Sequence, residues 1–132
     1  MEELKADEEE LSKLFKKIVK KDDIGIKLEK LKNKDISAMM TMSGETRKMQ
    51  EMMRMYASGM GIDEFSKEGL TLVLNANNQL VKYLLENKEG ENVNLICEQL
   101  FDLALIQHGP LSPDEMTKFI QRSNKIMMIL AK

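Results

Sequence analysis

Residues 92–130 constrain the fold more than any other stretch, because they hold two strongly apolar segments with helical spacing. The first segment, residues 92–108, is apolar around most of its circumference, and such a helix belongs in a core or against several neighbours. The second segment, residues 112–130, carries one apolar seam that consists of Met116, Phe119, Ile120, Met127 and Leu130. Together the two segments hold more apolar surface than a helical hairpin can bury on itself.

The residues between these two segments specify a tight turn. Gly109 suits a left-handed helix C-cap, and Pro110 cannot continue the helix before it. Ser112 is expected to cap the next helix, with Pro113 at its first position and Glu115 completing a capping box. The sequence therefore predicts a C-terminal helical hairpin.

The excess apolar surface of this hairpin has two alternative destinations. Two hairpins that meet face to face across a two-fold axis would form a four-helix bundle and bury it. Alternatively, the same surface packs on the chain's own sheet. The apolar pattern alone does not decide between a dimer and a monomer.

The composition indicates a single globular domain. The 132 residues are 42% apolar and 32% charged, which is enough to form a core without disulfides or metals. A net charge of −2 and an aromatic content of 5% give no basis for nucleic-acid binding. No apolar run is long enough for a membrane span, and the first residues lack the apolar core of a signal peptide. The single cysteine, Cys97, cannot form an internal disulfide, so we expect a cytoplasmic protein.

The rest of the chain mixes helical and strand patterns, so we expect an α+β fold with a small three-stranded sheet. A first helix is predicted to start at Asp7 or Ser12, and its apolar face is formed by Leu11, Leu14, Phe15, Ile18 and Val19. Residues 24–31 and 36–42 alternate as strands do, and the two strands would be antiparallel if the short polar turn between them closes a hairpin. The apolar run 70–75 predicts a third strand, and residues 80–85 predict a short helix.

Methionine is concentrated between the second and third predicted strands. A helix is expected from Ser43 to about Ala57, and its apolar residues are Met49, Met52, Met53, Met55 and Tyr56. Because methionine is unbranched and polarisable, such a face suits partners of varied shape. A stripe at helical spacing is also typical of core. A copper(I) site is the weakest alternative, since no cysteine or histidine lies in this stretch.

No pattern in the sequence indicates an active site. Cys97 and His108 are eleven positions apart on one predicted helix, a rise of about 16 Å, so they cannot meet within it. Cys97 is expected to be a small buried residue, and His108 a helix-capping cation or a surface residue. Phosphate-binding, dinucleotide-binding, serine-hydrolase and zinc-protease motifs are absent from the sequence. We therefore expect no enzymatic activity, no metal and no cofactor in this chain.

Several stretches of the sequence resemble the C-terminal domain of the ninety-kilodalton heat-shock chaperones, of the bacterial HtpG type. Residues 47–56 (RKMQEMMRMY) resemble the methionine-rich helix of that domain, and residues 72–77 (LVLNAN) with Leu80 and Val81 resemble its strand and following helix. Residues 96–104 (ICEQLFDLA) and 110–115 (PLSPDE) resemble its last two helices. The resemblance extends more weakly back to about Leu11 and so covers nearly the whole chain.

In that family this domain is the permanent homodimerisation module. The resemblance implies that residues 1–132 form one such domain, with a sheet-and-helix part over about 11–90 and dimerisation helices over about 91–131. The two helices of each copy would form a four-helix bundle. The implied interface residues are Leu100, Phe101, Leu103, Ala104, Phe119, Ile120, Met127 and Leu130.

The resemblance also implies other partners. The methionine-rich helix would be a contact for unfolded client proteins, formed by Met49, Met52, Met53, Met55 and Tyr56. ATP and magnesium are expected only in an N-terminal domain that this chain lacks, as it lacks the middle domain. Eukaryotic cytosolic members end in Met-Glu-Glu-Val-Asp, which recruits tetratricopeptide-repeat cochaperones. This chain ends in Ile-Leu-Ala-Lys, so we expect no docking of that kind.

The expected function is therefore homodimerisation within an ATP-dependent molecular chaperone, with the methionine-rich helix as the client contact. The alternative is a free-standing monomeric adaptor that binds a partner helix in a methionine-rich groove.

Overall fold

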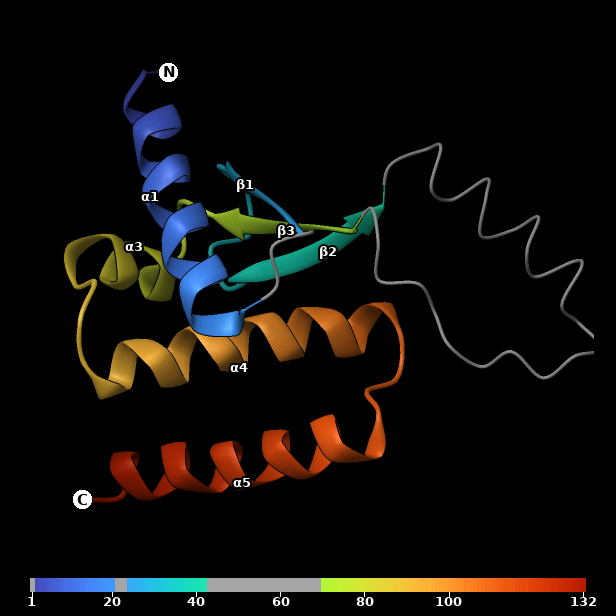
Figure 1. The fold of residues 1–132 in the computed structure, drawn as a ribbon. Coiled ribbons are helices and arrows are strands. Elements are labelled where there is room, and N and C mark those ends of the chain that lie inside the picture. Colours follow the sequence, from blue (N-terminus) through green and yellow to red (C-terminus); the bar gives the residue numbers. More distant parts are fainter. Residues whose placement is uncertain (1, 21–23, 43–69) are drawn as a thin grey trace, which may run out of the picture.

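The computed structural model describes residues 2–20, 24–42 and 70–132, which form a three-stranded sheet with helices (Figure 1). The elements are α1 (Glu2–Val19), β1 (Gly25–Glu29), β2 (Ala38–Met42), β3 (Leu70–Asn75), α3 (Gln79–Glu86), α4 (Glu91–His108) and α5 (Pro113–Leu130). Helix α4 runs beneath the sheet, and α5 lies on the side of α4 that faces away from it (Figure 1). The predicted α+β fold with a three-stranded sheet and a C-terminal helical hairpin is confirmed.

The sheet has the strand order β1-β3-β2. Strand β1 is parallel to β3 and pairs Glu29 with Asn75, whereas β2 is antiparallel to β3 and pairs Ala38 with Leu74. The turn between the first two strands therefore does not close a hairpin, because both strands pair with β3 and not with each other. Both strands are also shorter than the predicted ranges 24–31 and 36–42.

The burial of β3 explains why this strand is central. Leu72 and Leu74 are fully buried in the core, and Val73, whose side chain points to the opposite face, is only 4% exposed. A strand that is apolar on consecutive residues suits the middle of a sheet, whereas the alternating pattern of β1 and β2 suits its edges. The continuous apolar pattern of β3 therefore places it between β1 and β2, although the connection between those two strands is short.

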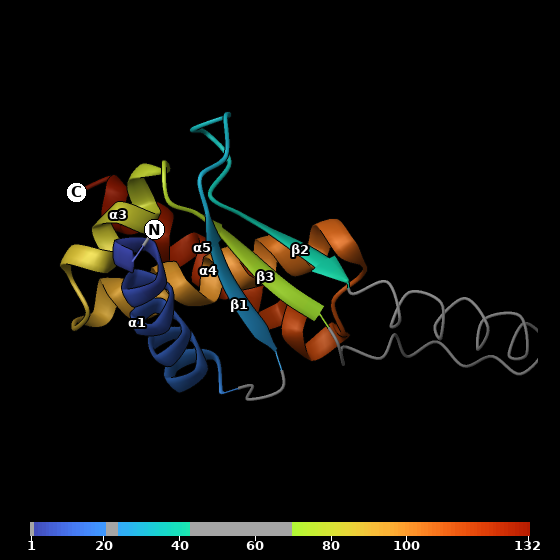
Figure 2. The same cartoon turned by 90° about the horizontal axis from the view of Figure 1, so that it is seen from above.

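Helix α1 runs beside the edge strand β1 (Figure 2). Its buried face consists of Leu11, Leu14 and Phe15, as predicted, but the helix begins at Glu2, earlier than either predicted start. The Glu8 carboxylate accepts a hydrogen bond from the Leu28 backbone amide at 2.9 Å. A side chain of α1 thus satisfies one of the backbone donors that an edge strand would otherwise expose.

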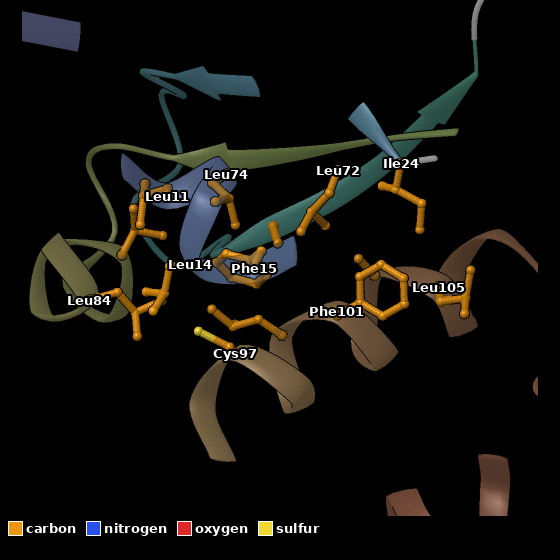
Figure 3. Packing of buried hydrophobic residues seen from close by; sticks show 14 of the residues in the cluster. Leu11, Leu14, Phe15, Ile24, Leu72, Leu74, Leu84, Cys97, Phe101 and Leu105 are labelled. Atoms are coloured by element: carbon orange, nitrogen blue, oxygen red, sulfur yellow. The ribbon is translucent and has the colours of Figure 1, made fainter. Parts of the chain in front are cut away.

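The core lies between the sheet and the helices α1 and α4 (Figure 3). Phe15 of α1, Leu72 and Leu74 of β3, and Cys97 and Phe101 of α4 converge there, and each is at most 3% exposed. The prediction that Cys97 is a small buried residue is confirmed.

The turn between α4 and α5 has the predicted capping box. Ser112 Oγ accepts a hydrogen bond from the Glu115 amide at 3.2 Å, and Glu115 Oε1 accepts one from the Ser112 amide at 3.0 Å. The predicted left-handed C-cap at Gly109 is wrong, because Gly109 is extended, with φ −172° and ψ 174°. The cause is Pro110, since a proline biases the residue before it toward extended backbone.

Asn75, the last residue of β3, is fully buried, and its side-chain amide makes four hydrogen bonds. Its Nδ2 donates to the carbonyl oxygens of Asn33 at 3.0 Å and Ile36 at 2.7 Å. Its Oδ1 accepts from the amides of Leu31 and Asn77, both at 3.0 Å. The connection from β1 to β2 passes over the end of β3 at this point, so one side chain satisfies backbone groups that have no strand partner.

We expect Asn75→Ala to destabilise the fold by about 2–4 kcal/mol, because it leaves several partly buried backbone groups unsatisfied. The matched control is Asn87→Ala, since Asn87 is exposed and its amide makes one hydrogen bond, to the Tyr83 carbonyl at 3.1 Å. Urea unfolding at a fixed protein concentration measures both variants. Equal losses in the two variants would show that the Asn75 amide does not hold this connection.

Candidate dimer interface

Among the elements that the structure describes, helix α5 is the one with no buried residue. It runs antiparallel to α4 and packs on the side of α4 opposite the sheet (Figure 1). None of its residues is buried, whereas α4, of the same length, buries six residues. An 18-residue helix with no buried residue gains little from packing within one chain.

The exposed residues of α5 include large apolar side chains. Ile120 is 52% exposed, Met127 57% and Leu130 79%, and Met116 and Met128 are exposed as well. Exposed apolar side chains that gather on one element form a candidate contact surface. We call Met116, Ile120, Met127 and Leu130 the α5 seam.

The contact between α4 and α5 includes a group of polar bonds, and Arg122 is at its centre. Its Nη1 donates to Asp102 Oδ2 at 2.9 Å and to Gln99 Oε1 at 3.2 Å, and its Nε lies 3.5 Å from Glu98 Oε2. The side chains of Arg122 and Asp102 are only 10% and 13% exposed. Charged groups this well covered depend on each other, because removing one leaves the other buried without a counter-charge.

Two further polar contacts join the helices on either side of Arg122. Gln99 Nε2 donates to Ser123 Oγ at 3.0 Å, and Lys125 Nζ lies 2.7 Å from Glu91 Oε1. The hydrogen bond and charge of Lys125 hold the pKa of the exposed Glu91 carboxyl below its usual value. These contacts fix α5 on α4 without using the α5 seam.

We expect Arg122→Ala to cost about 2–3 kcal/mol of unfolding free energy, since it leaves Asp102 covered but unpaired. Lys125→Ala is the matched control on the same helix, because its ion pair with Glu91 is exposed and such pairs contribute little. Urea unfolding of both variants at one protein concentration compares the two pairs. An Arg122 variant as stable as the Lys125 variant would contradict the expectation that losing the covered ion pair costs more than losing the exposed one.

The structure places the eight predicted interface residues in two different environments. Leu100, Phe101 and Ala104 are at most 3% exposed and lie in the chain's own core, on the side of α4 that faces the sheet, so they are closed to a second copy. Phe119 is partly buried against that core. The remaining four, Leu103, Ile120, Met127 and Leu130, are exposed. The sequence reasoning missed this division because α4 is apolar on both of its sides.

The predicted client-contact residues cannot be placed in the same way. Met49, Met52, Met53, Met55 and Tyr56 lie outside the described residues, as does the whole predicted helix from Ser43 to about Ala57.

The Cys97 thiol is a poor nucleophile in this fold. Burial raises the pKa of the Cys97 thiol to about 12, and the charge of Glu98 adds to the effect, so the reactive thiolate is scarce near neutral pH. His108 lies at the end of α4, eleven positions away along the same helix. Within residues 2–20, 24–42 and 70–132, no group of three or more His, Cys, Asp or Glu side chains could hold a metal ion. None of the described helices has the length and apolar character that crossing a membrane requires.

A hollow of about 580 Å³ lies between the end of α1, α4 and the start of α5. Its charged lining residues are Lys17, Lys20, Lys118, Arg122, Glu98, Asp102 and Glu115. Because Asp102 and Glu98 already pair with Arg122, these opposite charges largely offset one another. The hollow therefore has no strong preference for a cation or an anion.

Comparison with known proteins leaves the family open. No family model matches this sequence, and no curated protein matches it either.

Proposed function

We propose that this chain is a homodimerisation module, and that two copies pair through the α5 seam together with Leu103 of α4. The observation that carries the proposal is that α5 buries none of its residues while Ile120, Met127 and Leu130 are more than half exposed. Two hairpins brought together across a two-fold axis would form a four-helix bundle and remove this apolar surface from water.

The setting of this module is proposed from the sequence resemblance. The module would join two subunits of a cytoplasmic, ATP-dependent chaperone of the ninety-kilodalton heat-shock type, whose ATPase domain lies elsewhere in a longer chain. Unfolded proteins would be the clients, and the predicted methionine-rich helix would be their contact. Residues 1–132 would themselves carry no enzymatic activity.

We expect Ile120→Asp to convert a dimer into a monomer, because the dry centre of the interface would receive an unpaired carboxylate. Light scattering over a wide concentration range should give twice the 15.2 kDa of the single chain for the unaltered protein. The dissociation constant of the variant should rise by at least about a hundredfold.

Gln121→Asp is the matched control, since Gln121 is the exposed polar neighbour of Ile120 on the same helix. This variant should remain a dimer. A monomeric unaltered chain, or an Ile120→Asp dimer as tight as the unaltered one, would contradict the proposed interface. A monomer would favour the adaptor alternative.

The client contact has a separate test. Met52→Ser combined with Met53→Ser should weaken the ability of the chain to keep a chemically unfolded protein from aggregating, because it removes adaptable apolar surface. The dimer mass and the melting temperature should stay unchanged. Gln50→Ser on the same predicted helix is the control. A large fall in melting temperature would show instead that these methionines are core.

A further inference from the structure

We propose that Met116 and Met127 of the α5 seam are sites of reversible oxidation to methionine sulfoxide, and that this modification opens the dimer. The inference rests on the proposed homodimer, and it assigns a redox regulation to the same surface.

Methionine supplies half of the α5 seam. Met116 is 36% exposed and Met127 57% exposed in the single chain, so a small oxidant in water can reach both side chains. The other two seam residues, Ile120 and Leu130, have hydrocarbon side chains without a sulfur to oxidise. An interface that only had to be apolar could use branched residues throughout, because they specify one packing better than methionine does. The two methionines therefore give the seam a reactivity that its packing does not require.

The reaction is a two-electron oxidation of the thioether sulfur. Hydrogen peroxide transfers one oxygen atom to the sulfur, so that the O–O bond breaks, an S–O bond forms and the peroxide is reduced to water. Methionine sulfoxide reductases reverse the change, with one enzyme for each sulfoxide epimer. In that step a dithiol is oxidised to a disulfide, and the oxygen leaves the sulfur as water.

A sulfoxide is poorly tolerated inside an apolar contact. Its oxygen is a strong hydrogen-bond acceptor, and the side chains of Ile120 and Leu130 hold no donor for it. Burying an acceptor without a donor costs free energy, because the acceptor loses its hydrogen bonds to water. In the separate chain the same oxygen faces water and loses nothing. Oxidation therefore favours two monomers over the dimer.

The fold of the single chain does not depend on the two methionines. Arg122 holds α5 on α4 through Asp102 and Gln99, and neither methionine takes part in those bonds. Neither of them is among the apolar side chains that pack against the core. The oxidised chain should therefore keep its helical hairpin and lose only the pairing.

Met128 provides an internal reference for access to the seam. It directly follows Met127 and is 63% exposed, so the two neighbours are almost equally open to water in the single chain. One residue corresponds to 100° around a helix, which places Met128 outside the α5 seam. In the proposed dimer Met127 is covered and Met128 stays exposed. Pairing should therefore protect Met127 and leave Met128 reactive.

Treatment of the full chain with dilute hydrogen peroxide, followed by mass spectrometry of its peptides, measures the modification at each site. Well above the dissociation constant, Met127 should react several times more slowly than Met128. Well below it, the two should react at similar rates. Complete oxidation should raise the dissociation constant measured by light scattering by at least about tenfold. The helical circular dichroism should stay unchanged, and the two reductases should restore the dimer.

The matched control is Met116→Leu combined with Met127→Leu. It conserves the apolar volume of the seam, and it keeps every other methionine of the chain. This variant should form the dimer and retain its dissociation constant after the same peroxide treatment.

Three outcomes would overturn the assignment and leave the homodimer standing. The first is a dimer that survives complete oxidation of Met116 and Met127. The second is equal reaction of Met127 and Met128 in a dimer verified by its mass. The third is loss of the dimer when the double leucine variant is oxidised, which would place the sensitive group elsewhere. An unaltered chain that is monomeric before any oxidation would overturn the homodimer as well.

Discussion

The hydrogen bonds of the Asn75 side chain are the constraint on which the sheet depends. Strand β1 ends, β2 begins and β3 ends at the same end of the sheet, because β1 is parallel and β2 antiparallel to β3. The chain must therefore cross over the end of β3 in passing from β1 to β2. A crossing segment has no strand beside it to pair with, and the buried amide of Asn75 takes that role for Leu31, Asn33 and Ile36. Asn77 and Asn78 add hydrogen bonds to the carbonyls of Leu31 and Lys34.

Local chemistry was predictable from the sequence, and pairing between distant segments was not. The capping box of Ser112 and Glu115 was found correctly because all its atoms lie within one turn of helix. The strand order was missed because a short polar connection is typical of a hairpin, and nothing in residues 24–42 reveals that β3 will separate the two strands. The sequence does hold one indication that β3 is the central strand. Asn75 directly follows its apolar run, and the structure shows that this asparagine is buried. At Gly109 two local rules competed, and the effect of the following proline outweighed the preference of glycine for a left-handed cap.

The candidate interface was only partly predictable for a related reason. Helix α4 is covered by the sheet on one side and by α5 on the other, and both sides are apolar enough to look alike in a sequence. Leu100 and Leu103 are three residues apart, yet the first is in the core and the second is 41% exposed. Only the position of the sheet on one side of α4 explains why their exposures differ. The pairing of Arg122 with Asp102 also escaped prediction, because it joins residues twenty positions apart across the turn.

The position of α4 has a mechanical consequence for a paired molecule. In the proposed dimer, much of any force that pulls one sheet away from the other would pass through α4 and then α5, so two unlike contacts would carry it in series. The first is the dry packing of residues such as Phe101 against β3, and the second is the small group of polar bonds around Arg122. When two contacts carry a force in series, the weaker one breaks first. The contact between α4 and α5 is the weaker one, because α5 buries none of its residues. Under load, each molecule would lose its outermost helix before it lost its core.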